Sequence, residues 1–199
     1  MLTEQNIRTR LAGREPNAQP CTSDTPFASV AAVLRYSGRE PDVLLIRRSQ
    51  HPGDPWSGHM AFPGGRRDPG DADLVRTAVR ETREEVGLDL DERAEWLARL
   101  DDVQAISRAK PMDLIIVPQV FLISGDAARD EAALVIDDRE VDEALWTPLG
   151  PMLRGERNTT RPYEHRGRHF ELPGYQVGAH IVWGLTHRML EMLFEALRG

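Results

Sequence analysis

The sequence predicts an α+β fold in which helices pack on a mixed β-sheet. Apolar, strand-like runs lie before and after one strongly patterned helix at residues 73–86, and a second patterned helix lies near the end of the chain. Strands and helices do not alternate regularly, as they would in a fully parallel sheet. The 199 residues suit one compact domain with some additions.

The elements follow in this order along the chain. Residues 3–13 have weak helical patterning with Thr3 as the expected N-cap, and a Pro-containing polar linker follows. We therefore divide the chain into an N-terminal helix and linker arm, 1–26, and a single domain, 27–199. Later elements are strands at 27–36, 43–47, 96–105, 114–123 and within 135–146, a short helix at 148–154, a polar and basic loop at 155–169, and a helix at 180–197. Pro118 indicates that its strand is an edge or carries a bulge.

Composition excludes some classes of partner. With 25 basic and 32 acidic residues the net charge is −7, which disfavours binding to a nucleic acid duplex. The single cysteine, Cys21, permits no internal disulfide. No apolar run approaches the roughly 18 residues that span a bilayer, and the N-terminus has no apolar signal-peptide region. We therefore expect a cytoplasmic protein with no membrane partner.

The helix at residues 73–86 separates its charges. At about 100° per residue, one sector is apolar and faces a core; it holds Leu74, Val75, Ala78, Val79, Thr82 and Val86. Glu81, Glu84 and Glu85 gather in another sector without any arginine. Like charges three or four residues apart cost about 0.2–0.5 kcal/mol per pair. A divalent cation would relieve that repulsion, and carboxylate oxygens suit Mg²⁺ or Mn²⁺.

A glycine-rich turn precedes this helix. It ends a Pro/Gly-rich connection, residues 49–65, whose length is typical of a functional loop. The two glycines of Phe62–Gly65 permit a chain reversal and a close approach of the backbone to a metal or a phosphate. Asp71 or Asp73 is expected to cap the helix, and Gly87 to end it.

The string from Gly64 to Leu88, GGRRDPGDADLVRTAVRETREEVGL, resembles the signature of the Nudix hydrolases, G-x5-E-x7-R-E-U-x-E-E-x-G-U with U aliphatic. The matching residues are Gly65, Arg80, Glu81, Glu84, Glu85, Gly87 and Leu88. Asp71 replaces the first Glu, one extra residue precedes Arg80, and Thr82 replaces an aliphatic residue. The resemblance implies a Nudix-type α/β/α sandwich, with this helix and the C-terminal helix packed on the mixed sheet. It also implies that Glu81, Glu84, Glu85 and the Gly65 carbonyl bind Mg²⁺ or Mn²⁺, and that Arg80 orients them.

A narrower resemblance is to the coenzyme A pyrophosphatase subgroup, whose signature is close to L-L-T-x-R-S-x3-R-x3-G-x3-F-P-G-G. This chain has Leu44–Ser49 (LLIRRS), Gly58 and Phe62–Gly65, but one extra residue before Gly58 and no basic residue where the middle arginine is expected. The resemblance implies hydrolysis of coenzyme A or acyl-coenzyme A to 3′,5′-ADP and (acyl)phosphopantetheine. The alternatives are a Nudix hydrolase of ADP-ribose, NADH or a nucleoside triphosphate, and a non-hydrolytic nucleotide-binding regulatory module.

Further residues are candidates for single roles. Glu81 or Glu84 is a candidate general base on the helix. The resemblance implies a further acidic residue from a later loop, for which Glu140 and Glu143 are candidates, although a solvated strand end is the more common place for such residues. Substrate contacts are expected from Arg47 or Arg48, since neighbours on a strand point oppositely, and from the Gly64 backbone. Phe62 or Trp56 could stack on a base, although an aromatic residue near a Gly/Pro loop more often packs in a core. The basic residues His165, Arg166, Arg168 and His169 could hold a 3′-phosphate or form a solvated loop, and we favour the loop. Trp183, Met189 and Met192 are expected in the core or in a homodimer contact.

Overall fold

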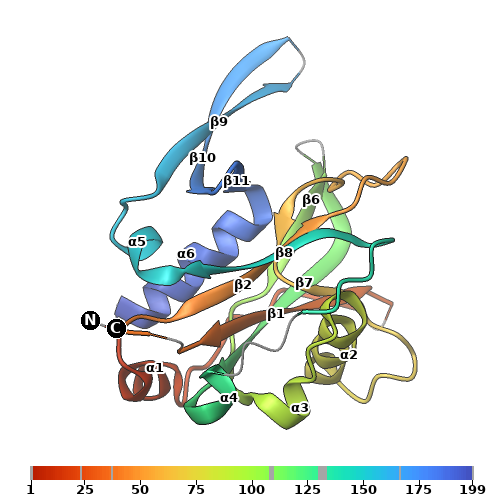
Figure 1. The fold of residues 1–199 in the computed structure, drawn as a ribbon. Coiled ribbons are helices and arrows are strands. Elements are labelled where there is room, and N and C mark those ends of the chain that lie inside the picture. Colours follow the sequence, from red (N-terminus) through yellow and green to blue (C-terminus); the bar gives the residue numbers. More distant parts are fainter. Residues whose placement is uncertain are drawn as a thin grey trace.

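A mixed sheet between helices forms the centre of the protein (Figure 1). The computed structural model describes residues 2–22, 24–36, 38–107, 110–129, 134–165 and 167–198. The strands are β1 (Phe27–Arg35), β2 (Asp42–Arg48), β3 (Met60–Ala61), β4 (Gly64–Arg66), β5 (Glu95–Arg99), β6 (Val103–Ser107), β7 (Lys110–Ile123), β8 (Val141–Pro148), β9 (Asn158–His165), β10 (Arg168–Val177) and β11 (His180–Trp183). The helices are α1 (Glu4–Leu11), α2 (Leu74–Val86), α3 (Leu90–Arg93), α4 (Gly125–Arg129), α5 (Leu149–Leu153) and α6 (Gly184–Arg198).

The main sheet is mixed, as the sequence predicts. Its central path runs β3-β2-β1-β7-β5, while β4 pairs with β1, β6 with β7, and β8 with β2. The β1–β7 pair is parallel, and the other pairs are antiparallel. A separate small sheet has the order β11-β10-β9.

Each face of the main sheet is covered by helices. Alternate residues of β1 point to opposite faces, so Ala31 and Val33 join the core under α2 while Ala32 and Leu34 join the core under α6 and α1. Figure 1 shows α2 and α6 on opposite sides of the sheet. The predicted α/β/α sandwich is confirmed.

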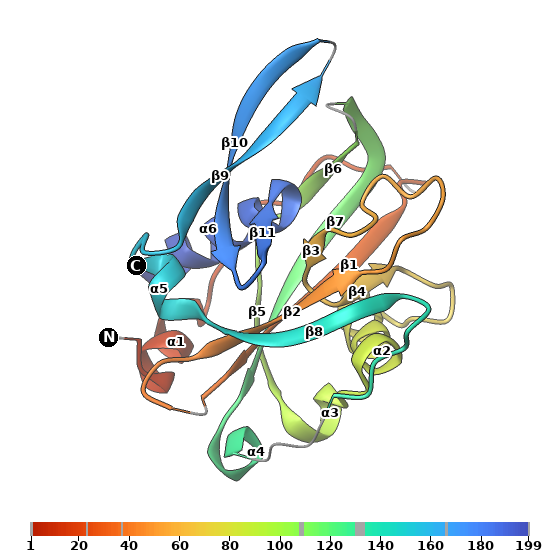
Figure 2. The ribbon, with the colours of Figure 1, turned by 45° about the horizontal axis from the view of Figure 1, so that its top comes forward.

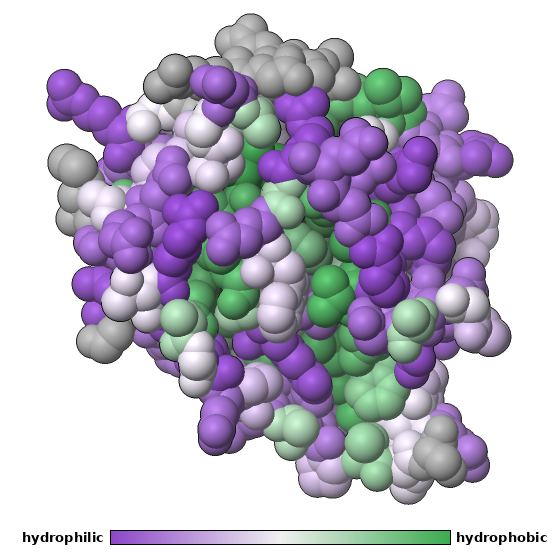
Figure 3. Space-filling view, turned by 90° about the horizontal axis from the view of Figure 1, so that it is seen from below, coloured by the Kyte–Doolittle hydropathy of each residue, from purple (hydrophilic) through white to green (hydrophobic). Residues whose placement is uncertain are grey.

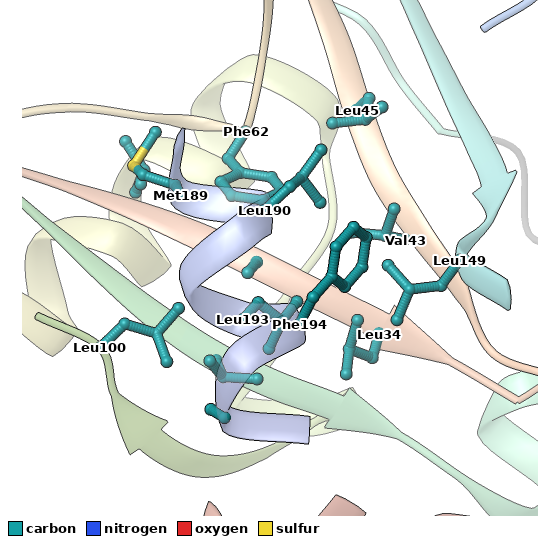
Figure 4. Close-up of a cluster of buried hydrophobic side chains, with 14 of the residues drawn as sticks. Leu34, Val43, Leu45, Phe62, Leu100, Leu149, Met189, Leu190, Leu193 and Phe194 are labelled. Carbon is teal, nitrogen blue, oxygen red and sulfur yellow. The ribbon is translucent and has the colours of Figure 1, made fainter. Parts of the chain in front are cut away.

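The core under α6 is filled by large apolar side chains (Figure 4). Leu190, Leu193 and Phe194 of α6 are buried against the sheet, and Phe194 lies beside Leu34 and Val43. The same core includes Ile7 of α1, which is 0% exposed. The helix predicted at the N-terminus is therefore present and packs on the domain, and Thr3 caps it by accepting a hydrogen bond from the Asn6 amide. The division of the chain at residue 26 stays a prediction.

The polar and basic loop predicted at residues 155–169 is wrong, because this segment builds most of a β-hairpin, β9–β10. Figure 1 shows the hairpin projecting from the rest of the fold. Its outer residues are mostly polar and exposed, with Phe170 as an exception, so the apolar alternation that normally reveals a strand is weak. The last helix also begins later than predicted, at Gly184, since residues 180–183 form β11 on the same small sheet.

Pro118 lies in the interior strand β7 and not at an edge. On one side residues 115–123 of β7 pair with β1, and on the other side β7 pairs first with β6 and then with β5. The junction between β6 and β5 falls opposite Pro118, with Val103 paired to Ile116 and Arg99 paired to Gln119. The missing N–H of proline therefore lies where the ladder is already interrupted.

Polar side chains cover much of the face seen from below in Figure 3, and apolar ones gather in a central band. Among the residues that the structure describes, no helix is long and apolar enough to cross a membrane.

Candidate active site

The helix α2 begins and ends at the residues that the sequence predicts. Asp73 is the N-cap and accepts a hydrogen bond from the Arg76 amide at 2.8 Å. Gly87 ends the helix in the left-handed conformation, with φ of 68°. Asp71, the other candidate cap, is buried and contacts Arg80 instead.

Arg80 organises the polar side of α2. Its Nε and one terminal nitrogen donate to the two oxygens of Asp71, each at 3.0 Å. Its other terminal nitrogen donates to Glu81 at 2.8 Å and to Glu84 at 2.9 Å. The Arg80 guanidinium holds the pKa of Asp71 well below its usual range. The aspartate in the first acidic position of the signature, although shorter than glutamate, thus makes a bidentate pair with this arginine.

Three carboxylates lie together at the end of this helix face, and we refer to Glu81, Glu85 and Glu140 as the acidic cluster. One oxygen from each lies within 4.8 Å of the other two. Glu85 is 1% exposed and accepts a hydrogen bond from the Gly64 amide at 2.8 Å. Burial raises the pKa of Glu85 to about 8, and it also raises the pKa of Glu81.

The glycines of the turn are required by close contacts. A Cβ on Gly65 would lie 2.5 Å from the Glu81 carboxyl carbon, and a Cβ on Gly64 would lie 2.4 Å from the Ser29 carbonyl oxygen. Gly64 also has φ of 148°, which favours glycine. The turn can therefore bring its backbone against the carboxylates only with these residues.

The acidic cluster fits a divalent cation. Burying a carboxylate is costly unless a positive charge compensates it. Among the described residues, Glu85 accepts a hydrogen bond from the Gly64 amide and is influenced by the charge of Arg48. Hard carboxylate oxygens at one point are the donor set that Mg²⁺ or Mn²⁺ prefers. Glu81, Glu85 and Glu140 are the residues that would hold such an ion.

Two residues predicted as metal ligands, Glu84 and Gly65, are not members of the acidic cluster. Glu84 is outside the acidic cluster, 58% exposed at its side chain, and its carboxylate contacts Arg80. Gly65 lies directly beside Glu81, as its close contacts require. The roles of Glu84 and of the Gly65 carbonyl as ligands stay predictions.

The two adjacent arginines of β2, Arg47 and Arg48, form ion pairs with different carboxylates. Arg47 pairs with Asp142 at 2.9 Å, while Arg48 pairs with Asp54 at 3.1 Å. The charge of Arg48 lowers the pKa of Glu85, opposing the effect of burial, so Arg48 is the arginine on the side of the acidic cluster. Of the two loop acids, Glu140 joins the cluster, whereas Glu143 contacts His180 at 2.8 Å.

The prediction that Phe62 stacks on the substrate is wrong. Phe62 is 1% exposed and lies in the core beside Leu190 of α6 (Figure 4). An aromatic residue next to a glycine-rich turn can turn inward, and here it anchors the turn to the sheet. Met189 is likewise buried in this core, at 3% exposure.

Without divalent cations, Glu85 should make the protein less stable as the pH rises. The carboxyl has a pKa of about 8 when folded against an ordinary value of 4.5, so the unfolded chain loses this proton first. Stability is then lost progressively between these two values. Urea unfolding with a chelator measures the free energy of unfolding near pH 5 and near pH 9. The stability of Glu85→Gln relative to the wild type should increase as the pH rises. An equal difference at both pH values would contradict this.

The comparison with known families decides the identity. A family model for the NUDIX domain matches residues 25–166, which is more than half of the chain. The chain belongs to the Nudix family. It is a Nudix pyrophosphohydrolase, similar to the human mitochondrial coenzyme A diphosphatase NUDT8, with 34% identity over 98% of this chain and 78% of that protein.

Other Nudix proteins are similar over nearly the whole chain. The uncharacterized Nudix hydrolase NudL of Yersinia enterocolitica is 30% identical over 98% of this chain and 92% of its own length. A MutT/nudix family protein from Enterococcus faecalis is 20% identical and shares the fold, with a TM-score of 0.51 over 98% of this chain and 68% of that chain.

Proposed function

We propose that this Nudix hydrolase splits the diphosphate linkage of coenzyme A or acyl-coenzyme A into 3′,5′-ADP and (acyl)phosphopantetheine. The observation that carries the proposal is the acidic cluster, in which the buried Glu85 and half-buried Glu81 meet Glu140. The substrate is supported by the similarity to coenzyme A diphosphatases from human and mouse and by the segments Leu44–Ser49 and Phe62–Gly65.

In the proposed reaction a water oxygen forms a bond to one phosphorus while the bond from that phosphorus to the bridging oxygen breaks. The water gives up one proton, and the second phosphate leaves with the bridging oxygen. Mg²⁺ or Mn²⁺, when bound, would neutralise charge on the phosphates and favour attack by water. The residues that would hold it are Glu81, Glu85 and Glu140, with Glu84 and the Gly65 carbonyl as further predicted ligands.

The chain's own residues supply positioning and proton transfer in this proposal. Arg80 fixes Glu81 through a 2.8 Å hydrogen bond, and the Gly64 amide fixes Glu85. Glu81, Glu84 and Glu140 are the carboxylates that could accept the proton, since Glu85 is enclosed. Arg48, half-buried on the cluster side, is positioned to attract phosphate.

The test is incubation of the purified protein with coenzyme A and Mg²⁺ or Mn²⁺, with products identified by mass. We expect 3′,5′-ADP and phosphopantetheine, and no turnover with a chelator. The same protein should be given ADP-ribose, NADH, dinucleotides and nucleoside triphosphates. Good turnover of one of these without turnover of coenzyme A would overturn the substrate assignment. Tight nucleotide binding with no turnover of any compound would instead favour a regulatory module.

We also propose a cytoplasmic location and a homodimeric state. Cys21 is an exposed free thiol, which is compatible with a reducing compartment. The human relative is named a mitochondrial protein, so fractionation of the source cell should compare the two compartments. Light scattering coupled to size-exclusion chromatography tests the dimer, and a monomer at micromolar concentration would contradict it.

A further inference from the structure

A basic and aromatic group lies where the β9–β10 hairpin meets the main fold. The Arg161 guanidinium of β9 lies over the Trp183 ring, 4.5 Å from its centroid. The rings of His59 and Tyr163 lie 4.6 and 5.9 Å from the same indole. Figure 2 shows β11, which carries Trp183, between this hairpin and β3. The stack therefore joins the hairpin to the end of the long loop that leads into the glycine turn.

Arg161 differs from Arg47, Arg48 and Arg80 in its partners. Arg47, Arg48 and Arg80 each have a carboxylate partner within 4.0 Å. In the part of the chain that the structure describes, Arg161 is exposed and has no carboxylate partner. Its guanidinium lies over the Trp183 ring instead. Stacking uses the flat face of a guanidinium and leaves its N–H edge free, and that edge matches two oxygens of a phosphate.

The stack and the acidic cluster lie on connected elements. The positive charges of both Arg161 and Arg48 act on His59, and Arg48 also acts on Glu85. On the other flank, Glu140 of the cluster is followed three residues later by Glu143, which contacts His180 of β11. The acidic cluster and the stack on Trp183 are therefore linked through β8 and β11.

His59 does not compete with Arg161 as a cation. Burial, and then the neighbouring charge of Arg161, lowers the pKa of His59 below its ordinary value. The imidazole is therefore neutral near pH 7, and the free positive charge of the stack belongs to the Arg161 guanidinium.

We propose that Arg161, held against Trp183, binds a phosphomonoester that the substrate carries outside the diphosphate linkage. This rests on the proposed function, because in coenzyme A the group would be the 3′-phosphate of the nucleotide. Arg161 is then a residue of specificity. It contacts no reacting atom. Substrates without the extra phosphate therefore lose only the binding energy that Arg161 supplies.

The experiment compares coenzyme A with 3′-dephospho-coenzyme A in the wild type, Arg161→Gln and Arg168→Gln. Arg168, an exposed arginine of β10 on the same hairpin, belongs to the basic group that the sequence also suggested for a 3′-phosphate, so Arg168→Gln tests that alternative. We expect Arg161→Gln to lower kcat/KM for coenzyme A by about 10- to 100-fold, the range of a charged hydrogen bond. The change should lie mainly in KM. Turnover of the dephospho compound should change by less than about 3-fold, which also shows that the variant is folded.

Three outcomes are decisive. The inference is overturned, and the proposed function stands, if Arg161→Gln has the same ratio of kcat/KM for the two compounds as the wild type. The same holds if Arg168→Gln shows the larger selective loss of kcat/KM for coenzyme A. If the wild type hydrolyses both compounds equally well, the inference is also overturned. If neither compound is hydrolysed while another diphosphate is, the proposed function fails first and the inference fails with it.

Discussion

Replacing Glu85 with glutamine is expected to lower turnover by at least ~10²-fold, the scale of losing a strong electrostatic contribution. The amide keeps an oxygen that can accept the Gly64 N–H, so the local fold should persist. What is lost is the negative charge that Glu85 would carry with a divalent cation bound to the acidic cluster. Steady-state turnover of the substrate that the panel selects, with Mn²⁺ titrated, measures the loss and any weakening of metal affinity.

The matched control is Glu92→Gln, which changes an exposed glutamate in the neighbouring helix α3. It should keep wild-type turnover. Glu84→Gln, predicted from the signature to cause a loss as large as Glu85→Gln, tests whether Glu84 leaves Arg80 to join the metal site. Near-normal turnover in both Glu84→Gln and Glu85→Gln would remove the proposed site.

The second large effect is expected from Arg80→Met. This change leaves Asp71 buried and without its bidentate partner, since the Asp71 side chain is 7% exposed. Breaking a buried pair from one side costs about 3 kcal/mol, which for a chain of this size lowers Tm by roughly 6–12 °C. Turnover should fall as well, because Glu81 loses its 2.8 Å hydrogen bond.

Arg76→Met is the matched control for stability. Arg76 lies one turn earlier on α2 and pairs with Asp91 at 2.6 Å, but the two side chains are 46% and 53% exposed. Exposed pairs contribute only about 0–1 kcal/mol, so Tm should move by no more than about 2–4 °C. Thermal unfolding of both variants compares them, and similar melting temperatures would contradict the role of Arg80.

Local patterning predicted the parts of the site that depend on neighbours in the chain. The bounds of α2, its cap at Asp73 and its end at Gly87 follow from 3.6-residue periodicity and cap chemistry. The need for glycine in the turn also came from the sequence, and the structure gives the reason in the contacts of Gly64 and Gly65 with Ser29 and Glu81.

Other features depended on contacts that sequence spacing does not contain. Glu140 and Glu143 are equivalent by composition, but Glu140 lies in the turn before β8 and joins the acidic cluster, whereas Glu143 lies within β8 and contacts His180. Phe62 was open to either burial or stacking until α6, more than a hundred residues later, covered it. The β9–β10 hairpin had only weak apolar alternation to reveal it.

The sequence by itself determined the family, the sandwich class and the carboxylate-bearing helix, because these reside in local periodicity and in one contiguous motif. Only the tertiary structure decided that Glu85 is the buried member, that Glu140 completes the acidic cluster, and that Arg161 lies on Trp183. Burial and charge proximity are properties of the packed chain, since they arise where segments far apart in sequence exclude water from one another.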